Sequence, residues 1–140
     1  MTGPQIDIRD VLTRYCMLCD DGRFDEWGEL FTSDARFAVM DHVHEGRAAI
    51  QSFIEAGQPA ERRGRHAGLG SIVDVDSDGL SARAWTDFLF VSRQFDIKVI
   101  GRYHDELVLD PSDGRWRFTL REIVFLGSEP TLTSHPSGHP

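Results

Sequence analysis

The stretch GRYHDELVLDPSDGRWRF, residues 101–118, decides the fold class, because it predicts two long strands joined by a tight turn. We expect these strands over residues 95–109 and 115–125. The connecting segment DPSDG, residues 110–114, consists of residues that each favour a turn for a physical reason. Proline presets φ, glycine tolerates positive φ, and aspartate and serine side chains bond to the backbone close by. The stretch therefore predicts a β-hairpin.

A second hairpin is expected upstream, with strands over residues 66–75 and 80–91 joined at Asp78-Gly79, a dipeptide common in tight hairpin turns. The first half of the chain has helical patterns instead. Helices are expected over residues 6–19, 24–31 and 47–56, and a short strand over 35–40 follows a turn at 32–34. Helices first and long antiparallel strands after them are typical of the α+β class.

Length and charge restrict the function classes. A chain of 140 residues predicts one domain. Its formal net charge of −8 lacks the basic character of a nucleic-acid-binding protein. No apolar run approaches the roughly 20 residues that cross a bilayer, and the N-terminal MTGPQIDIRD lacks the features of a signal peptide. We therefore expect a cytoplasmic protein with neither a nucleic-acid nor a membrane partner.

Cys16 and Cys19 form a C-x-x-C motif, which could indicate a redox or zinc site. The surrounding apolar residues recur with helical spacing, however, and a cysteine in such a setting behaves as a small buried hydrophobe. No second C-x-x-C motif completes a zinc site. We interpret both cysteines as structural helix residues.

Four segments in order resemble the SnoaL-like division of the nuclear transport factor 2-like (NTF2-like) superfamily. They are YCMLCDDGRFDEWGELFTSDARF (15–37), EGRAAIQSFI (45–54), GRHAGLGSIVDV (64–75) and the hairpin stretch 101–118. This division includes polyketide cyclases, scytalone dehydratase, bile acid 7α-dehydratase and a dehydrochlorinase. The resemblance implies a cone in which three N-terminal helices close a strongly curved, mostly antiparallel sheet around a deep pocket. It also implies a homodimer formed through the sheet and no cofactor. The domain is expected over residues 1–128, with a flexible tail over 129–140.

The resemblance also implies a catalytic dyad. In dehydratase-like members, an aspartate at the end of the first helix pairs with a histidine at the start of the long strand, and these positions match Asp20 and His66. A histidine is a usable general base near neutral pH. A carboxylate on its other nitrogen fixes the tautomer and stabilises the imidazolium. The alternative for His66 is a histidine exposed at the rim of the cone.

Other candidates follow from the same resemblance. Tyr15 matches a cavity tyrosine and could donate a hydrogen bond to a substrate oxygen, and Arg121 matches a cavity arginine that could hold an oxyanion or a leaving group. The alternatives are a core aromatic for Tyr15 and an arginine paired with an acid for Arg121. Phe88 stands where the bile acid dehydratase has a second acid, and Asp87 points to the opposite face. The expected pocket wall is mostly apolar, which suits a hydrophobic substrate, and consists of Ala84, Thr86, Phe88 and Phe90.

The segment DHVHE, residues 41–45, could begin a metal site, because alternate residues of a strand share a face. We instead expect a loop at the rim of the pocket, with His42 or His44 contacting substrate and no bound metal. His104 is expected to face solvent.

Three functions are compatible with these features. The first is a cofactor-independent lyase or isomerase acting on a small hydrophobic molecule with a carbonyl or hydroxyl group. The second is a non-catalytic binding module with the same pocket, because one fold hosts many functions. The third is an association domain like the small subunit of ring-hydroxylating dioxygenases. The pair of Asp20 and His66 favours the first.

Overall fold

The structure, a computed structural model, describes residues 1–137 and confirms the predicted α+β class. In chain order, the elements are α1 (Gly3–Asp20), α2 (Phe24–Gly28), β1 (Phe31–Val39), β2 (His42–Glu45), α3 (Arg47–Gly57), a short 3-10 helix (Ala60–Arg62), β3 (Arg65–Val75), β4 (Ser81–Val91), β5 (Ile97–Asp110) and β6 (Arg115–Phe125). Within residues 1–137, none of the helices combines the length and apolar character that a bilayer-spanning helix requires.

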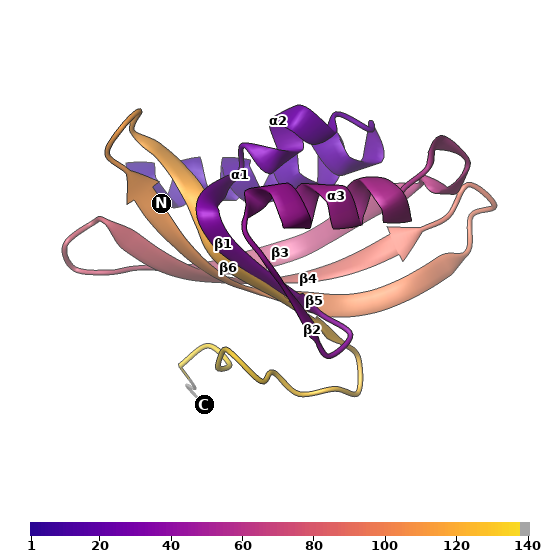
Figure 1. Cartoon of the computed structure of the whole chain (residues 1–140). Coiled ribbons are helices and arrows are strands. Elements are labelled where there is room, and N and C mark those ends of the chain that lie inside the picture. The colour runs from indigo at the N-terminus through magenta and orange to yellow at the C-terminus, as the bar shows by residue number, and fades with distance from the viewer. Residues whose placement is uncertain (138–140) are drawn as a thin grey trace.

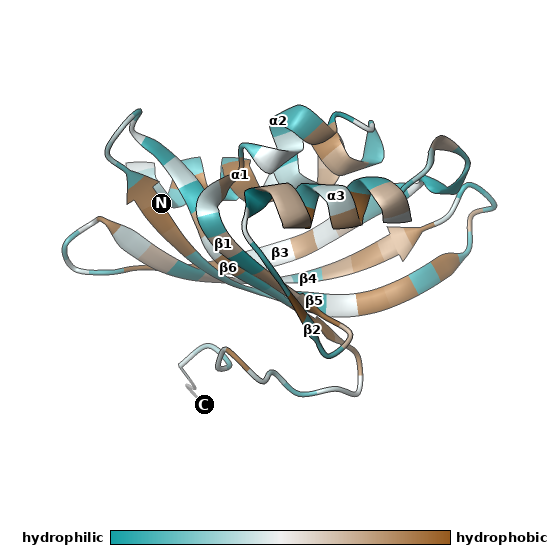
Figure 2. Cartoon of the chain, in the orientation of Figure 1, coloured by the Kyte–Doolittle hydropathy of each residue, from teal (hydrophilic) through white to brown (hydrophobic). Residues whose placement is uncertain are grey.

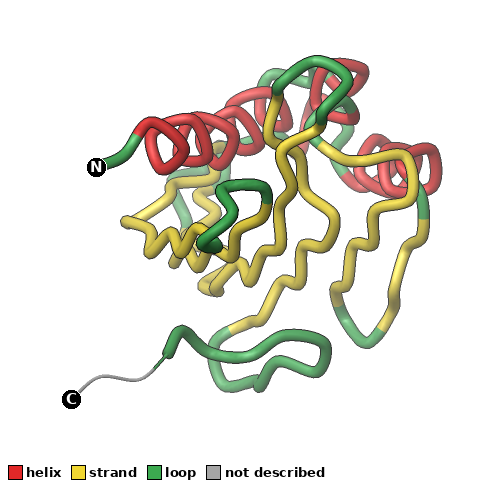
Figure 3. The backbone as a smooth tube through the Cα atoms, turned by 90° about the vertical axis from the view of Figure 1, so that its left-hand side faces the viewer, coloured by secondary structure: helices red, strands yellow, loops and turns green. Residues whose placement is uncertain are grey.

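One curved sheet contains all six strands, in the order β2-β1-β6-β5-β4-β3. The β1–β6 pair is parallel and the other neighbours are antiparallel. The three helices cover one face of this sheet, and the C-terminal segment runs along the other (Figures 1 and 3). The two faces of the central strands are therefore both covered, but by different parts of the chain.

An aromatic cluster fills the space between the helices and the sheet. The ring of Tyr15 in α1 lies 5.3 Å from Trp27 in α2 and 5.3 Å from Tyr103 in β5, measured between centroids. Phe31 in β1 lies 5.1 Å from Phe118 in β6. Hydrophobic and hydrophilic residues are interspersed along the strands (Figure 2), but the end of β4, Phe88–Val91, is continuously apolar. The cluster joins both helical and sheet layers into one core.

The second helix is shorter than predicted. α2 ends at Gly28, and Phe31 begins β1 instead of closing the helix. Phe31 is fully buried and pairs with Phe118 across the β1–β6 ladder. Residues 32–34, predicted as a turn, lie inside β1 at the irregularity between Phe31 and Arg36. Burial of Phe31 against the sheet outweighs the local helical pattern.

Residues 42–45 form a strand where we expected a rim loop. Met40 and Asp41 have φ values of 52° and 61°, which suit a two-residue hairpin turn. β2 therefore folds back on β1 in antiparallel pairing. The rings of His42 and His44 lie 4.4 Å apart, as alternation along a strand requires.

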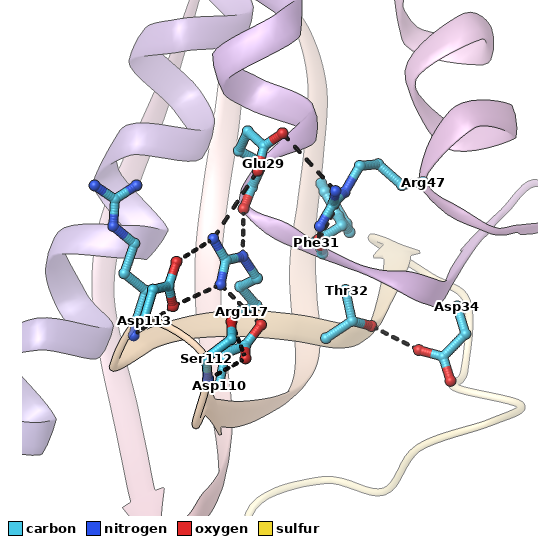
Figure 4. Close-up of polar contacts among 10 residues, drawn as sticks. Glu29, Phe31, Thr32, Asp34, Arg47, Asp110, Ser112, Asp113 and Arg117 are labelled. Carbon is cyan, nitrogen blue, oxygen red and sulfur yellow. Dashed lines mark hydrogen bonds and ion pairs between the residues drawn. The ribbon is translucent and has the colours of Figure 1, made fainter.

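Arg117 ties the turn between β5 and β6 to the end of α2 (Figure 4). Its guanidinium lies 2.9 Å from the carboxylate of Asp110 and 2.8 Å from that of Asp113, and it donates to the carbonyl oxygen of Glu29 at 2.9 Å. Gly114 completes the turn with a φ of 72°. The predicted turn thus closes the hairpin and also holds α2 over the end of the sheet.

The C-terminal strap, which we define as residues 128–135, packs on the outer face of the sheet. Glu122 of β6 accepts hydrogen bonds from the backbone N–H groups of residues 131–133, at 2.8–3.3 Å, and from the hydroxyls of Thr131 and Thr133. This part of the predicted flexible tail is therefore hydrogen-bonded to the sheet in the structure. Residues 138–140 of the expected tail lie outside the described residues.

His104 lies under the strap, where its side chain is only 1% exposed, so the expected solvent-facing position is wrong. Its Nδ1 lies 3.3 Å from the carbonyl oxygen of Ser134, and Trp85 Nε1 donates to the same oxygen at 2.8 Å. Trp85, His104 and Glu122 are register partners on three adjacent strands. The strap thus crosses the row formed by these three side chains.

Changing Glu122 to glutamine is expected to lower the free energy of unfolding by about 1–3 kcal/mol, because an amide cannot satisfy five donors as a carboxylate does. Amide hydrogen exchange of residues 131–133 should become faster in this variant. The exposed strap residue Glu129, changed to glutamine, is the matched control and should change stability little. Unchanged exchange in the Glu122 variant would show that the strap is not held by this carboxylate.

Acid should loosen the strap in two stages. Burial lowers the pKa of His104 from 6.5. Burial opposes ionisation of Glu122, but hydrogen bonds from Thr133 and Thr131 outweigh it, and the pKa of Glu122 falls below 4.5. His104 and Glu122 each bind fewer protons in the folded chain than in the unfolded chain. Each therefore contributes fully to stability at a pH above its ordinary pKa, 6.5 for His104 and 4.5 for Glu122, and this contribution decreases as the pH falls. Trp85 fluorescence against pH should first change below about 6.5 and again below about 4.5.

Candidate functional site

The candidate site is a pocket of about 430 Å³ between α1 and the inner face of the sheet. Glycine at two positions of β3 leaves this space open. A β-carbon on Gly70 would meet nothing within 4 Å, and one on Gly68 would meet only the methyl of Thr86, at 3.6 Å. Gly70 has a φ of 122°, at the irregularity of the β3–β4 pairing between Gly68 and Ser71. The GLGS segment thus shapes the pocket. The lining residues are Arg9, Leu12, Thr13, Cys16, Met17, His66, Gly68, Gly70, Ser71, Thr86, Tyr103 and Arg121.

The structure brings Asp20 and His66 together in this site. α1 ends at Asp20, because Gly22 just beyond it takes a φ of 73° and turns the chain. Asp20 Oδ1 lies 2.6 Å from His66 Nδ1, and Asp20 Oδ2 accepts the backbone N–H of His66 at 2.8 Å. The carboxylate therefore fixes both the backbone and the ring of His66.

The protonation pattern of His66 follows from this contact. A carboxylate only accepts, so the Nδ1 facing Asp20 carries the hydrogen, and in the neutral ring Nε2 is the nitrogen with a free lone pair. The side chains of His66 and Asp20 are only 13% and 4% exposed. The ring of His66 also packs 4.7 Å from that of Phe90. His66 is thus a sheltered pocket residue, not one exposed at the rim.

Arg121 lines the floor of the pocket and is also paired with an acid, as the alternative interpretation predicted, although the sequence analysis did not name the partner, Asp105. Its Nε and Nη2 bond to the two oxygens of Asp105 at 2.7 and 2.8 Å, and both side chains are completely buried. The guanidinium carbon lies 3.8 Å from the ring centre of Tyr103 and 4.1 Å from that of Tyr15. Burial opposes the charge of Arg121, but Asp105 outweighs it, so the pKa of the guanidinium is raised.

One hydrogen-bond donor of this floor remains free. Among the described residues, Arg121 Nη1 is buried and has no hydrogen-bond partner. Leaving such a group unpaired costs about 1–3 kcal/mol or more. Arg121 is also one of the residues that line the pocket. Ser71 and Thr86 add a second polar element, since their hydroxyls lie 2.7 Å apart on the pocket wall.

Three predicted site residues lie elsewhere. Tyr15 is a core aromatic against Trp27, and Phe88 is buried and stacked on Tyr103 at 4.0 Å, so neither is a lining residue. His42 lies on β2 and lines a different cavity. Of the predicted site residues, the pocket therefore contains His66, Thr86 and Arg121 in its wall, with Asp20 behind His66.

The two cysteines are free, buried thiols. Burial raises the pKa of Cys16 to about 11, and burial together with Asp20 raises that of Cys19 to about 12. Ligand atoms of Cys19, Asp20 and His66 lie within 4.8 Å of one another. A metal ion there would have to replace the bonds between Asp20 and His66 and deprotonate a thiol, so the geometry suits a hydrogen-bonded dyad better than a metal centre.

Filling the pocket should weaken ligand binding without unfolding the chain. Gly68 in β3 has a backbone that any residue can adopt, and its added β-carbon would make ordinary contact with Thr86. Valine at position 68 is therefore expected to weaken binding at least about tenfold, because its methyl groups take space from the ligand. Binding of an apolar probe and urea unfolding should be measured together. Normal binding by a folded Gly68→Val variant would place the ligand elsewhere.

The missed residue Asp105 has a sequence signal that could have identified it. Tyr103, Asp105 and Leu107 alternate along one face of a predicted strand, and two of the three are apolar. An acid in such a row lies on the buried face and needs a cationic partner. By contrast, no local pattern distinguishes Arg9 or Ser71, which reach the pocket through the packing of α1 on β3.

Comparisons with solved structures agree with the observed fold. The chain is 26% identical to an NTF2-like protein with a cystatin-like fold from Novosphingobium aromaticivorans, with a TM-score of 0.74 over 89% of this chain and 83% of that one. A protein named as a candidate scytalone dehydratase from the same organism shares 22% identity, with a TM-score of 0.76 over 100% and 99% of the two chains. The β subunit of a candidate aromatic-ring-hydroxylating dioxygenase, also from that organism, shares 20%, with a TM-score of 0.71 over 86% and 88%.

The last two similarities show a common fold alone, because their identities are low. No curated protein matches the chain. A family model, the SnoaL-like domain, matches residues 5–122, which is most of the sequence. The chain therefore belongs to the SnoaL-like family and has its NTF2-like fold.

Proposed function

We propose that the protein is a cofactor-independent lyase or isomerase that removes a proton from carbon in a small, largely apolar substrate. The observation that carries this proposal is the use of both Asp20 oxygens on His66, which leaves Nε2 as the basic nitrogen of a pocket residue. General acid–base catalysis by such a pair contributes about 10²–10⁴ in rate. The candidate scytalone dehydratase with the same fold is consistent with this chemistry.

The proposed reaction begins with a carbon acid next to a carbonyl group. His66 Nε2 takes the proton, and the electrons of the C–H bond move toward the carbonyl oxygen to form an enolate. Arg121 Nη1 donates a hydrogen bond to that oxygen, where charge develops. In a β,γ-unsaturated substrate, the imidazolium, stabilised by Asp20, returns the proton to the γ carbon as the double bond moves into conjugation with the carbonyl group. In a β-hydroxy substrate, it gives the proton to the departing hydroxyl while the enolate electrons form the new carbon–carbon double bond. The first route is an isomerisation and the second a dehydration.

Proton exchange provides the test. We would incubate cyclic and aryl ketones with the protein in D₂O and follow loss of the α-proton by NMR. Faster exchange that disappears in His66→Gln would support the proposal. If no ketone exchanges faster than in buffer, yet several bind in the pocket, the protein is better described as a binding module.

The similarity to a dioxygenase β subunit supports a second candidate, an association domain. Leu69, Ile72 and Ile100 are exposed apolar residues of β3 and β5 that an interface could cover. The predicted homodimer through the sheet would use this outer face too, and the strap would then lie in the interface. Light scattering of the full chain, with a truncation after residue 127, would show whether the protein self-associates and whether the strap contributes.

A further inference from the structure

We propose that Arg9 forms an anion subsite at the open side of the pocket, so that the ligand is an amphipathic carboxylate. Its apolar body would occupy the pocket, and its carboxylate would lie at Arg9. This inference rests on the proposed function at one point only: the reacting carbonyl group determines which end of the ligand points into the pocket.

The row of α1 residues along the pocket identifies its open side. Leu12 and Cys16 are buried, whereas Thr13 and Met17 are exposed and Arg9 is half-buried. Arg9, Thr13 and Met17 are spaced four residues apart, so they follow one another along one face of the helix. A ligand group that stays partly in water would therefore lie beside Arg9.

The guanidinium of Arg9 is held in place without being neutralised. Its Nη1 donates to the carbonyl oxygen of Ser71 at 3.0 Å, in the irregular part of β3. Within residues 1–137, no carboxylate lies within 4.0 Å of it, whereas Arg14, five residues further along the helix, is paired with Asp10 at 2.6 Å. Arg9 Nε donates to the sulfur of Met1 at 2.9 Å. Arg9 thus keeps a positive charge that no carboxylate balances, and its Nη2 has no hydrogen-bond partner among residues 1–137.

The pocket lining is cationic although the chain as a whole carries −8. Its charged residues are Arg9 and Arg121, with His66 as a titratable group, and the lining contains no aspartate or glutamate. The carboxylates of Asp20 and Asp105, which contact two lining residues, are bonded to His66 and Arg121. A negatively charged ligand group therefore meets no unpaired acid in the pocket wall.

Arg9, not Arg121, is the suitable partner for a full negative charge. Asp105 already balances Arg121 in a completely buried pair. A second carboxylate there would place two anions against one cation in a dehydrated site, which is costly. Arg9 can bind a carboxylate through charge-assisted hydrogen bonds while part of it stays hydrated. The carbonyl group of the same ligand would then point inward to Arg121.

Two probes of matched shape test the subsite: 2-naphthoate and 2-naphthamide. Their affinities should be measured by NMR titration against the full chain, Arg9→Gln and Arg14→Gln. Both substitutions remove one positive charge from α1, so they change the long-range field alike. We expect the native chain to bind the naphthoate about 3- to 10-fold more tightly than the amide. Arg9→Gln should lose this preference, Arg14→Gln should keep it, and added salt should reduce it.

Three outcomes would overturn the subsite: equal binding of the two probes, no detectable binding of either, or a preference for the naphthoate that persists in Arg9→Gln. These results are independent of the proposed function, because the measurement needs no turnover. A protein that is inactive in every proton-exchange assay can still prefer the naphthoate through Arg9, and an active protein can lack this preference.

Discussion

Replacing His66 by glutamine is expected to lower the rate of proton abstraction by about 10²–10⁴, with little loss of ligand binding. Glutamine keeps most of the ring's volume and can still bond to Asp20, but it has no basic nitrogen. Asp20→Asn should cause a loss of similar size. Its amide can donate to Nδ1, which would place the hydrogen on Nε2 and remove the base. Single-turnover exchange with saturating ketone would separate rate from affinity.

A matched control is His135→Gln, which changes an exposed histidine in the C-terminal strap, away from the pocket. Its rate should equal that of the native protein. If His66→Gln and Asp20→Asn both retain more than about a tenth of the native rate, His66 is not the general base.

Breaking the buried pair on the pocket floor should have the largest effect on stability. Arg121→Met would leave Asp105 buried without a cation, and we expect the free energy of unfolding to fall by about 3–5 kcal/mol. Arg102→Met is the matched surface control, because it breaks the exposed pair with Asp87 at 2.5 Å and should cost less than about 1 kcal/mol. Urea unfolding of the three proteins gives the comparison.

The pH dependence of Arg121→Met adds a second test. Burial raises the pKa of Asp105, and Arg121 opposes this rise. Without Arg121, Asp105 should take up a proton at a higher pH in the folded chain than in the unfolded chain. The variant is then least destabilised at acid pH, and its stability decreases as the pH rises. The double variant Arg121→Met with Asp105→Leu should regain most of the loss at neutral pH. A single variant as stable as the native chain would show that the pair is not needed.

The long strands of the second half could be predicted closely, because their alternation and turn residues act locally. The turn at residues 110–114 and the Asp78-Gly79 turn set the hairpins without help from the rest of the chain. The end of α2 could not be predicted in the same way. Phe31 fits a helical face in the sequence, and only its burial against Phe118 in the sheet places it in β1.

For the candidate site, Asp20 and His66 were identified through resemblance to a family, since 46 positions separate them and no local pattern relates them. The pairing of Arg121 with Asp105 depends on strand register, which the hairpin turn could have supplied. The hydrogen bonds between Glu122 and the strap involve a segment whose composition alone indicates a flexible tail. Polar contacts between distant segments are therefore what the sequence left open.

The pairing of Asp20 with His66 is tested most directly by ¹⁵N NMR of the His66 ring in the native chain. We expect a protonated Nδ1 with a strongly downfield proton, a Nε2 shift typical of a free lone pair, and loss of the downfield proton in Asp20→Asn. A ring with its hydrogen on Nε2, or one with no slowly exchanging proton on Nδ1, would contradict the pairing and remove the basis for His66 as the general base.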